Sequence, residues 1–147
     1  MSQTANFALP LLFAAQAQKE ITHNEALVII DALLGGCVEA VAADPAELEP
    51  AEGSAWIVGP SPVGAWAGKA AQIAIFTAGG WRFVAGLAGM RMYDRAAAIV
   101  RMHDGGTWSA PPAISGASGG TVVDVEARST VALMLAALRS HGLLDAT

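Results

Sequence analysis

Residues 71–84, AQIAIFTAGGWRFV, carry the clearest signal of secondary structure in the chain. Hydrophobic side chains alternate through the first half, so Ile73 and Ile75 share one face, as in a β-strand with one buried side. Ala78-Gly79-Gly80 then predicts a tight turn, because glycine adopts the backbone angles that short hairpin turns require. Residues 81–84 return the chain. The segment therefore predicts an antiparallel β-hairpin.

More strands are predicted on both sides of this hairpin. The candidates lie at residues 37–42, 54–58, 90–93 and 98–103, with a short segment at 107–109 after the turn Asp104-Gly105-Gly106. Between the first two candidates, residues 44–53 contain two prolines and four carboxylates, a composition that excludes a central strand. We therefore expect residues 1–110 to form one domain built around a small antiparallel β-sheet.

Helices are predicted before and after the sheet region. Thr22-His23-Asn24-Glu25 has the spacing of a capping box at the start of a helix, and Gly35-Gly36 supplies a left-handed end. Residues 111–123 form a flexible Gly/Ser/Pro linker, and residues 124–147 contain a helix that Gly142 closes. The expected fold class is α+β: an N-terminal helix packed on a small antiparallel β-sheet, then the linker and a C-terminal amphipathic helix.

The C-terminal helix carries an apolar stripe formed by Val131, Met134, Leu135 and Leu138. A lone helix of about 18 residues is marginally stable in water, so this stripe needs a cover. It either docks on its own domain or bundles with the same helix from other copies. We expect it to serve as an oligomerisation or docking helix.

Composition excludes several classes of protein. Of the 147 residues, 54% are hydrophobic and 14% are charged, which argues against a disordered chain. The net charge of -5 argues against nucleic-acid binding, which needs a basic surface. There is no run of about 18 apolar residues, so no membrane insertion is expected. The single cysteine, Cys37, cannot form an intramolecular disulfide or a cysteine zinc site.

No catalytic constellation is recognisable. His23, His103 and His141 lie in separate regions without metal-ligand spacing. The carboxylates at residues 44–53 lie in a mobile loop, whereas a glycosidase holds two carboxylates at a fixed separation. We expect no enzyme, no catalytic residues, no metal and no cofactor. A glycan-cleaving enzyme stays open only through a composite site between subunits.

One group of residues favours binding. Residues 64–103 contain five basic side chains against one acid, and aromatic faces beside cations bind sugars by stacking and charge-assisted hydrogen bonds. The candidate glycan-binding residues are Trp66, Trp81, Arg82, Tyr93 and Trp108. Each of the three tryptophans follows a glycine turn, so we expect each to begin a strand with its ring over the sheet. The alternative is that the aromatics cover the core and the arginines are solvated or pair with another subunit.

Three groups of residues carry a resemblance to a known family. They are Leu9-Pro10 with residues 15–27 and Asp31; residues 64–68 with Ile73-Ala74 and residues 80–83; and Asp104-Gly105 with Trp108. Together they span roughly residues 4–110 and resemble a family of phage-derived domains found in prophages and gene transfer agents. The segment from Gln16-Ala17-Gln18-Lys19 to His23-Asn24-Glu25-Ala26 is the most specific part of this resemblance.

The resemblance implies a structural component of a phage-like particle, in the base or anchor of a tail fibre or head spike. It implies a bacterial host and, after release, a place in the virion; cytoplasmic synthesis is expected because no targeting segment is visible in the sequence. We expect the chain to form a homo-oligomer, as a trimer or pentamer, and to bind other capsid or tail proteins. Gln16, Gln18, Lys19 and Asn24 are expected to fix the N-terminal packing or to form a docking surface. The alternative function is a carbohydrate-binding module for cell-surface polysaccharide.

Overall fold

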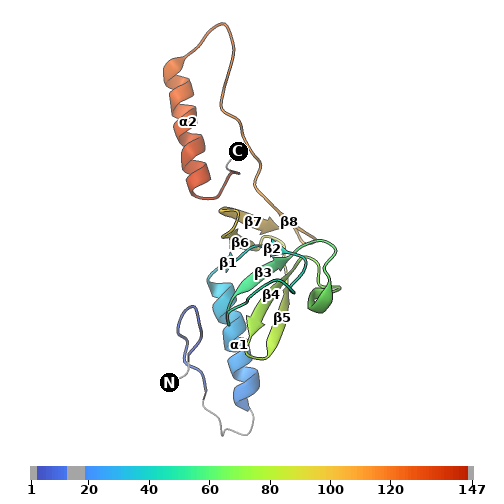
Figure 1. Ribbon diagram of the computed structural model, residues 1–147. Coiled ribbons are helices and arrows are strands. Elements are labelled where there is room, and N and C mark those ends of the chain that lie inside the picture. The colour runs from blue at the N-terminus through green and yellow to red at the C-terminus, as the bar shows by residue number, and fades with distance from the viewer. Residues whose placement is uncertain (1–2, 13–18, 146–147) are drawn as a thin grey trace.

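The computed structural model describes residues 3–12 and 19–145, and within them two α-helices flank eight strands (Figure 1). This arrangement confirms the predicted α+β class. In chain order the elements are α1 (Lys19–Leu34), β1 (Cys37–Val38), β2 (Val41–Ala42), β3 (Ala55–Val58), the 3₁₀ turn η1 (Gly64–Trp66), β4 (Gln72–Thr77), β5 (Gly80–Ala85), β6 (Arg91–Asp94), β7 (Ile99–His103), β8 (Trp108–Ser109) and α2 (Val125–Ser140).

The strands form two mixed sheets, in the orders β1-β6-β7-β8 and β2-β3-β4-β5, where the sequence predicted one antiparallel sheet. The reason lies in the extended segment 37–42, which serves both sheets. Val38 pairs in parallel with Asp94, and three residues later Val41 pairs in parallel with Ile57. Between them, Glu39 donates its N–H to Ala55 O of β3 in one sheet. Its carbonyl oxygen accepts the N–H of Ala96, two residues after β6 of the other sheet. The predicted single strand is therefore two short strands.

The predicted hairpin is confirmed as β4 and β5. Thr77 pairs with Gly80 at its closed end, and Gly80 has a φ of +92°, in the region that favours glycine. Ile73 and Ile75 are fully buried on the same face of β4. Alternation thus predicted both the element and its inward side.

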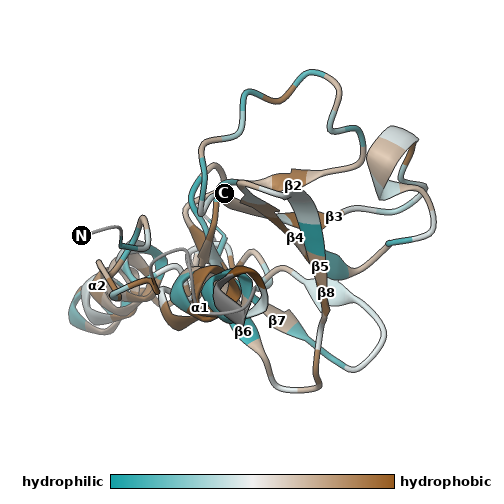
Figure 2. Ribbon diagram, turned by 90° about the horizontal axis from the view of Figure 1, so that it is seen from below, coloured by the Kyte–Doolittle hydropathy of each residue, from teal (hydrophilic) through white to brown (hydrophobic). Residues whose placement is uncertain are grey.

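Two hydrophobic clusters cover the two faces of the sheet β2-β3-β4-β5, so β3 is buried at every position. One cluster lies between this sheet, α1 and the other sheet, and its buried members are Ala32, Val38, Ala55, Ile57, Ile73, Ile75 and Met92. The other lies under η1 and the acidic loop, and its buried members are Trp56, Val58, Trp66 and Ala74. Figure 2 shows the strands on one side of the molecule and the helices on the other.

Helix α1 begins at Lys19, so the capping box predicted at residues 22–25 lies inside the helix. The side chains of that motif serve tertiary contacts instead, as described below for Asn24 and Glu25. The predicted end is confirmed, because Gly36 has a φ of +58° and donates its N–H to Leu33. Residues 3–12 fold back on themselves, with Gln3 bridging Pro10, and lie beside α1 (Figure 1).

Helix α2 stands away from the sheets at the end of an extended linker and returns toward them (Figure 1). The predicted helix limits are confirmed, with Asp124 as N-cap accepting from Ala127 N and Gly142 at a φ of +67° beyond the end. After the helix, Gly142 O accepts the N–H of Val100 at 2.8 Å. This contact latches the C-terminal segment onto the part of β7 that β8 does not pair.

Candidate functional site

The structure divides the five predicted glycan-binding residues between two places. Trp66 and Trp81 lie in an aromatic cluster, where the Trp81 ring makes edge contacts with Trp56, Trp66 and Phe76 at centroid distances of 5.6, 5.0 and 5.0 Å. Trp66 belongs to the turn η1 and not to a strand, and none of its surface is exposed. A fully buried ring cannot stack on an external sugar, so Trp66 is a core residue.

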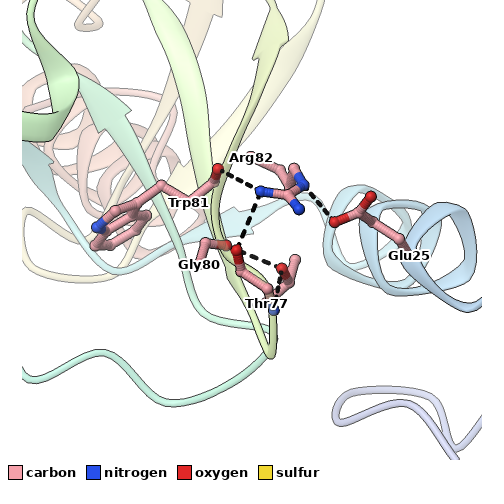
Figure 3. A network of polar contacts seen from close by, with 6 residues as sticks. Glu25, Thr77, Gly80, Trp81 and Arg82 are labelled. Atoms are coloured by element: carbon pink, nitrogen blue, oxygen red, sulfur yellow. Dashed lines mark hydrogen bonds and ion pairs between the residues drawn. The ribbon is translucent and has the colours of Figure 1, made fainter. Parts of the chain in front are cut away.

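Arg82 points away from the aromatic cluster and toward α1 (Figure 3). Its guanidinium forms an ion pair with Glu25 and donates to the carbonyl oxygens of Trp81 at 3.1 Å and Gly79 at 3.3 Å. Thr77 Oγ1 bonds to Gly79 N and Gly80 O across the same turn. Arg82 therefore ties the hairpin to α1, and it does not share a surface with the Trp81 ring.

Tyr93 and Trp108 belong to the other sheet but project from opposite faces. Met92 pairs with Arg101 and Trp108 pairs with His103 on the inner face, whereas Tyr93 is the alternate, outward residue of β6 and is 37% exposed. The five residues therefore do not form one binding surface. Trp108 lines a cavity.

That cavity lies between the two sheets and has a volume of about 370 Å³. Most of its wall is apolar, and Arg101 and Trp108 supply the larger side chains on the side of β7 and β8. Its lining residues are Val41, Ile57, Val58, Gly59, Pro60, Ala70, Ala71, Arg101, Gly106, Thr107 and Trp108. We refer to it as the intersheet cavity. Convergent polar groups in an apolar hollow are typical of small-molecule sites.

A buried carboxylate holds Arg101 in place. Arg101 Nε lies 2.7 Å from Asp94 Oδ2, and the two side chains are 19% and 2% exposed. The other oxygen of Asp94 accepts the N–H of Ala97 at 3.1 Å. A buried carboxylate that is both paired and hydrogen-bonded fixes its partner well. Sequence reasoning included Arg101 among the basic residues but did not identify the pair.

The Trp108 ring is equally well fixed. Its Nε1 donates to Ala71 O at 2.9 Å, and its ring meets that of the buried His103 edge-on at 5.0 Å. Beside it, Asp104 Oδ1 accepts the N–H groups of Gly106 and Thr107, both at 2.8 Å. These bonds hold the pKa of Asp104 below its ordinary value. Asp104 thus shapes the turn that forms one wall, and His103 accepts from Gly105 N.

Backbone strain occurs at the rim of the intersheet cavity. Ser61 and Ala71 have φ angles of +54° and +61°, in the left-handed region that residues other than glycine rarely adopt. Ala71 lines the cavity, and Ser61 directly follows the lining residue Pro60 in the chain. Such strain costs of the order of 1–3 kcal/mol per residue and is concentrated at functional sites.

The residues predicted to act in N-terminal packing or docking differ in their location and contacts. Gln16 and Gln18 lie outside the described residues, and Lys19 is the first residue of α1. Asn24 accepts the N–H of Leu12 at 2.8 Å and donates to Leu12 O at 3.0 Å. Asn24 therefore holds the chain's own N-terminal arm, residues 3–12, against α1.

Asp31 is the second anchor of this arm. It is fully buried and accepts from Thr4 Oγ1 at 2.7 Å, Asn6 N at 2.7 Å and Phe7 N at 2.8 Å. Burial alone raises the pKa of a carboxyl, but these three bonds outweigh it and the pKa of Asp31 is lowered. The arm is thus attached through a charged group inside the protein.

The apolar stripe of α2 is mostly uncovered in the single chain. Leu135 is buried, whereas Val131, Met134 and Leu138 are 39%, 53% and 39% exposed. The linker does bind the helix end, since Arg139 donates to Ile114 O at 2.6 Å. Leu135 packs within the chain, and the rest of the stripe remains open to another surface.

Within residues 3–12 and 19–145, no three His, Cys, Asp or Glu side chains gather as a metal site would require. Neither helix in this part of the chain has the length and hydropathy of a membrane span. Cys37 is half-buried and donates to Gly35 O.

The fold and its cavity define a small two-sheet α+β domain with an intersheet cavity and an appended helix. The chain belongs to the DUF2793 family, described as proteins of unknown function, whose model matches residues 23–109. The match runs from α1 to β8 and leaves α2 outside. No curated protein matches the sequence.

Proposed function

We propose that this protein is a structural subunit of a phage-like or gene-transfer-agent-like particle, which self-associates through α2 in the base of a tail fibre or head spike. The observation that supports self-association is the helix itself. Among its 16 residues only Leu135 is buried, and the helix stands apart from the sheets (Figure 1). An isolated helix of this length is marginally stable, so a partner surface would stabilise it.

The particle assignment is supported by the resemblance of the N-terminal and central motifs to phage-derived domains. The same particle would carry other capsid or tail proteins as partners, with a trimer or pentamer of this chain as the expected unit. Carbohydrate binding through one surface of Trp66, Trp81, Arg82, Tyr93 and Trp108 is less well supported, because these side chains lie on different faces of two sheets.

Light scattering on the purified chain tests the association. We expect a single species with a mass of three or five times 15.0 kDa. Met134→Glu combined with Leu138→Glu should reduce the mass to that of the monomer, because both side chains are on the stripe and exposed in the single chain.

Leu133→Glu is the matched control, since Leu133 is 70% exposed and lies on the opposite side of α2 from the stripe. It should leave the oligomer intact. A monomeric wild type, or dissociation by both sets of substitutions alike, would contradict the role of the stripe. Antibody labelling of purified particles in the electron microscope tests the location, and unlabelled particles would contradict it.

A further inference from the structure

The intersheet cavity combines a fixed donor group with apolar walls, and nothing in the assembly proposed above uses it. We infer that it binds a ligand in which a carboxylate is attached to a single six-membered ring, with Arg101 binding the carboxylate and Trp108 contacting the ring. This inference does not depend on the oligomeric state of the chain.

The donor group is the free end of the Arg101 guanidinium. Its Nε is occupied by Asp94, and among the described residues the side chain forms no further hydrogen bond. Asp94 therefore sets the plane of the guanidinium while the two terminal nitrogens stay open. Arginine presents only donors, so the ligand must supply an acceptor there, and two parallel N–H groups match the two oxygens of a carboxylate.

The walls determine the rest of the ligand. Val41, Pro60 and Ala70 are apolar, and the Trp108 side chain forms part of the opposite side. A volume of about 370 Å³ lies near the lower end of the range for small-molecule sites. The space therefore suits one ring and its substituent better than an extended chain.

The site is also preorganised. Trp108 is held by its bond to Ala71 O and by the edge of the His103 ring, so it does not need to move to meet a ligand. The left-handed backbone at the lining residue Ala71 is a separate observation. Strained residues persist where the surrounding structure enforces them, and they are frequent at ligand sites.

The test is a titration of the ¹⁵N-labelled full chain with cyclohexanecarboxylate, followed by the indole N–H signals in NMR spectra. The Trp108 signal is assigned from its loss in Trp108→Phe. It should shift in a saturable way, because this N–H bonds to Ala71 O and both residues line the cavity. The Trp81 signal should not shift, since Trp81 lies in the aromatic cluster. Cyclohexanecarboxamide, which lacks the charge, should bind about tenfold more weakly or worse.

Two further measurements define the ring of the ligand and test the role of Arg101. If glucuronate shifts Trp108 as cyclohexanecarboxylate does, the site accepts a hydroxylated sugar ring; if only cyclohexanecarboxylate shifts it, the ring must be apolar. Either result supports the carboxylate. Arg101→Lys keeps a positive charge beside Asp94 but removes the two parallel N–H groups of the guanidinium. It should therefore weaken carboxylate binding at least tenfold.

Arg95→Lys is the matched control, because Arg95 also pairs with a carboxylate, Glu39 at 2.7 Å, but outside the intersheet cavity. It should bind like the wild type. The inference is overturned if neither carboxylate shifts Trp108, or if acid and amide bind wild type equally well. Both of these results come from the wild-type protein and do not depend on the stability of the variants.

Discussion

Asp31 is the buried charge on which the N-terminal arm depends. Asp31→Asn removes the charge and places an amide beside the Asn6 and Phe7 N–H donors. We expect a loss of about 2–4 kcal/mol in the free energy of unfolding, since bonds to a buried charged group are lost together. Urea unfolding measures it, with the exposed Glu52→Gln as a control that should change stability by less than about 0.5 kcal/mol. Equal effects would show that the arm does not depend on Asp31.

The lowered pKa of Asp31 makes this stabilisation depend on pH. Its ordinary value is 3.8, and the value in the folded protein is lower. The contribution is therefore fully present well above pH 3.8 and is lost as the pH falls through the folded pKa. The gap in unfolding free energy between wild type and Asp31→Asn should be constant near neutral pH and shrink below pH 3.8. A gap that stays constant down to acid unfolding would contradict this assignment.

Gly86 shows how closely His103 is packed. A Cβ at position 86 would lie 2.5 Å from His103 Cδ2 and 2.6 Å from Nε2. Gly86→Ala should therefore displace the ring on which Trp108 rests and cost about 1–3 kcal/mol in stability. Gly116→Ala, where a Cβ would meet nothing within 4 Å, is the control. Thermal unfolding compares the two, and equal melting temperatures would show that the His103 ring is free to move.

The latch between α2 and β7 depends on one glycine. At Gly142 a Cβ would lie 3.1 Å from Ile99 Cα and from Val100 N, and φ is +67°. Gly142→Ala should open the bond from Val100 N to Gly142 O, so hydrogen exchange at the Val100 amide should rise at least tenfold. The Tyr93 amide, which bonds to Gly36 O on the other edge of the sheet, should keep its protection. Unchanged exchange at Val100 would show that the latch tolerates a side chain.

Strands and helix ends were predictable where the signal is local. The hairpin β4–β5, the strands β6 and β7 and the limits of α2 follow from alternation, glycine turns and a capping aspartate. The division into two sheets does not, because two residues, Glu39 and Ala40, carry the chain from one sheet to the other. The start of α1 was misplaced because Thr22 and Glu25 have the spacing of a capping box, whereas Glu25 pairs with Arg82 and the neighbouring Asn24 binds Leu12.

The candidate site was predictable only in part. Trp108 was predicted to bind glycan and lies in the wall of the intersheet cavity, and the inward alternation of Asp94, Arg101 and His103 on β6 and β7 was a usable signal. The opposite wall comes from residues 41, 57–60 and 70–71, which reach the cavity only through the packing of the two sheets. Small apolar residues in loops carry no sign of such a role. Trp66 was misjudged because its burial against the other aromatic rings is a tertiary effect.

At the level of the whole molecule, the proposed association through α2 would link stability to protein concentration. If the folded chain gains a partner that the unfolded chain lacks, a tenfold rise in protein concentration adds about 1 kcal/mol per subunit. For a chain of this length the melting temperature should then rise by about 2–4 °C. Met134→Glu with Leu138→Glu should remove this dependence, whereas Leu133→Glu should retain it. Calorimetry at two concentrations measures the shift, and a wild-type melting temperature that does not change with concentration would mean that α2 meets no second copy.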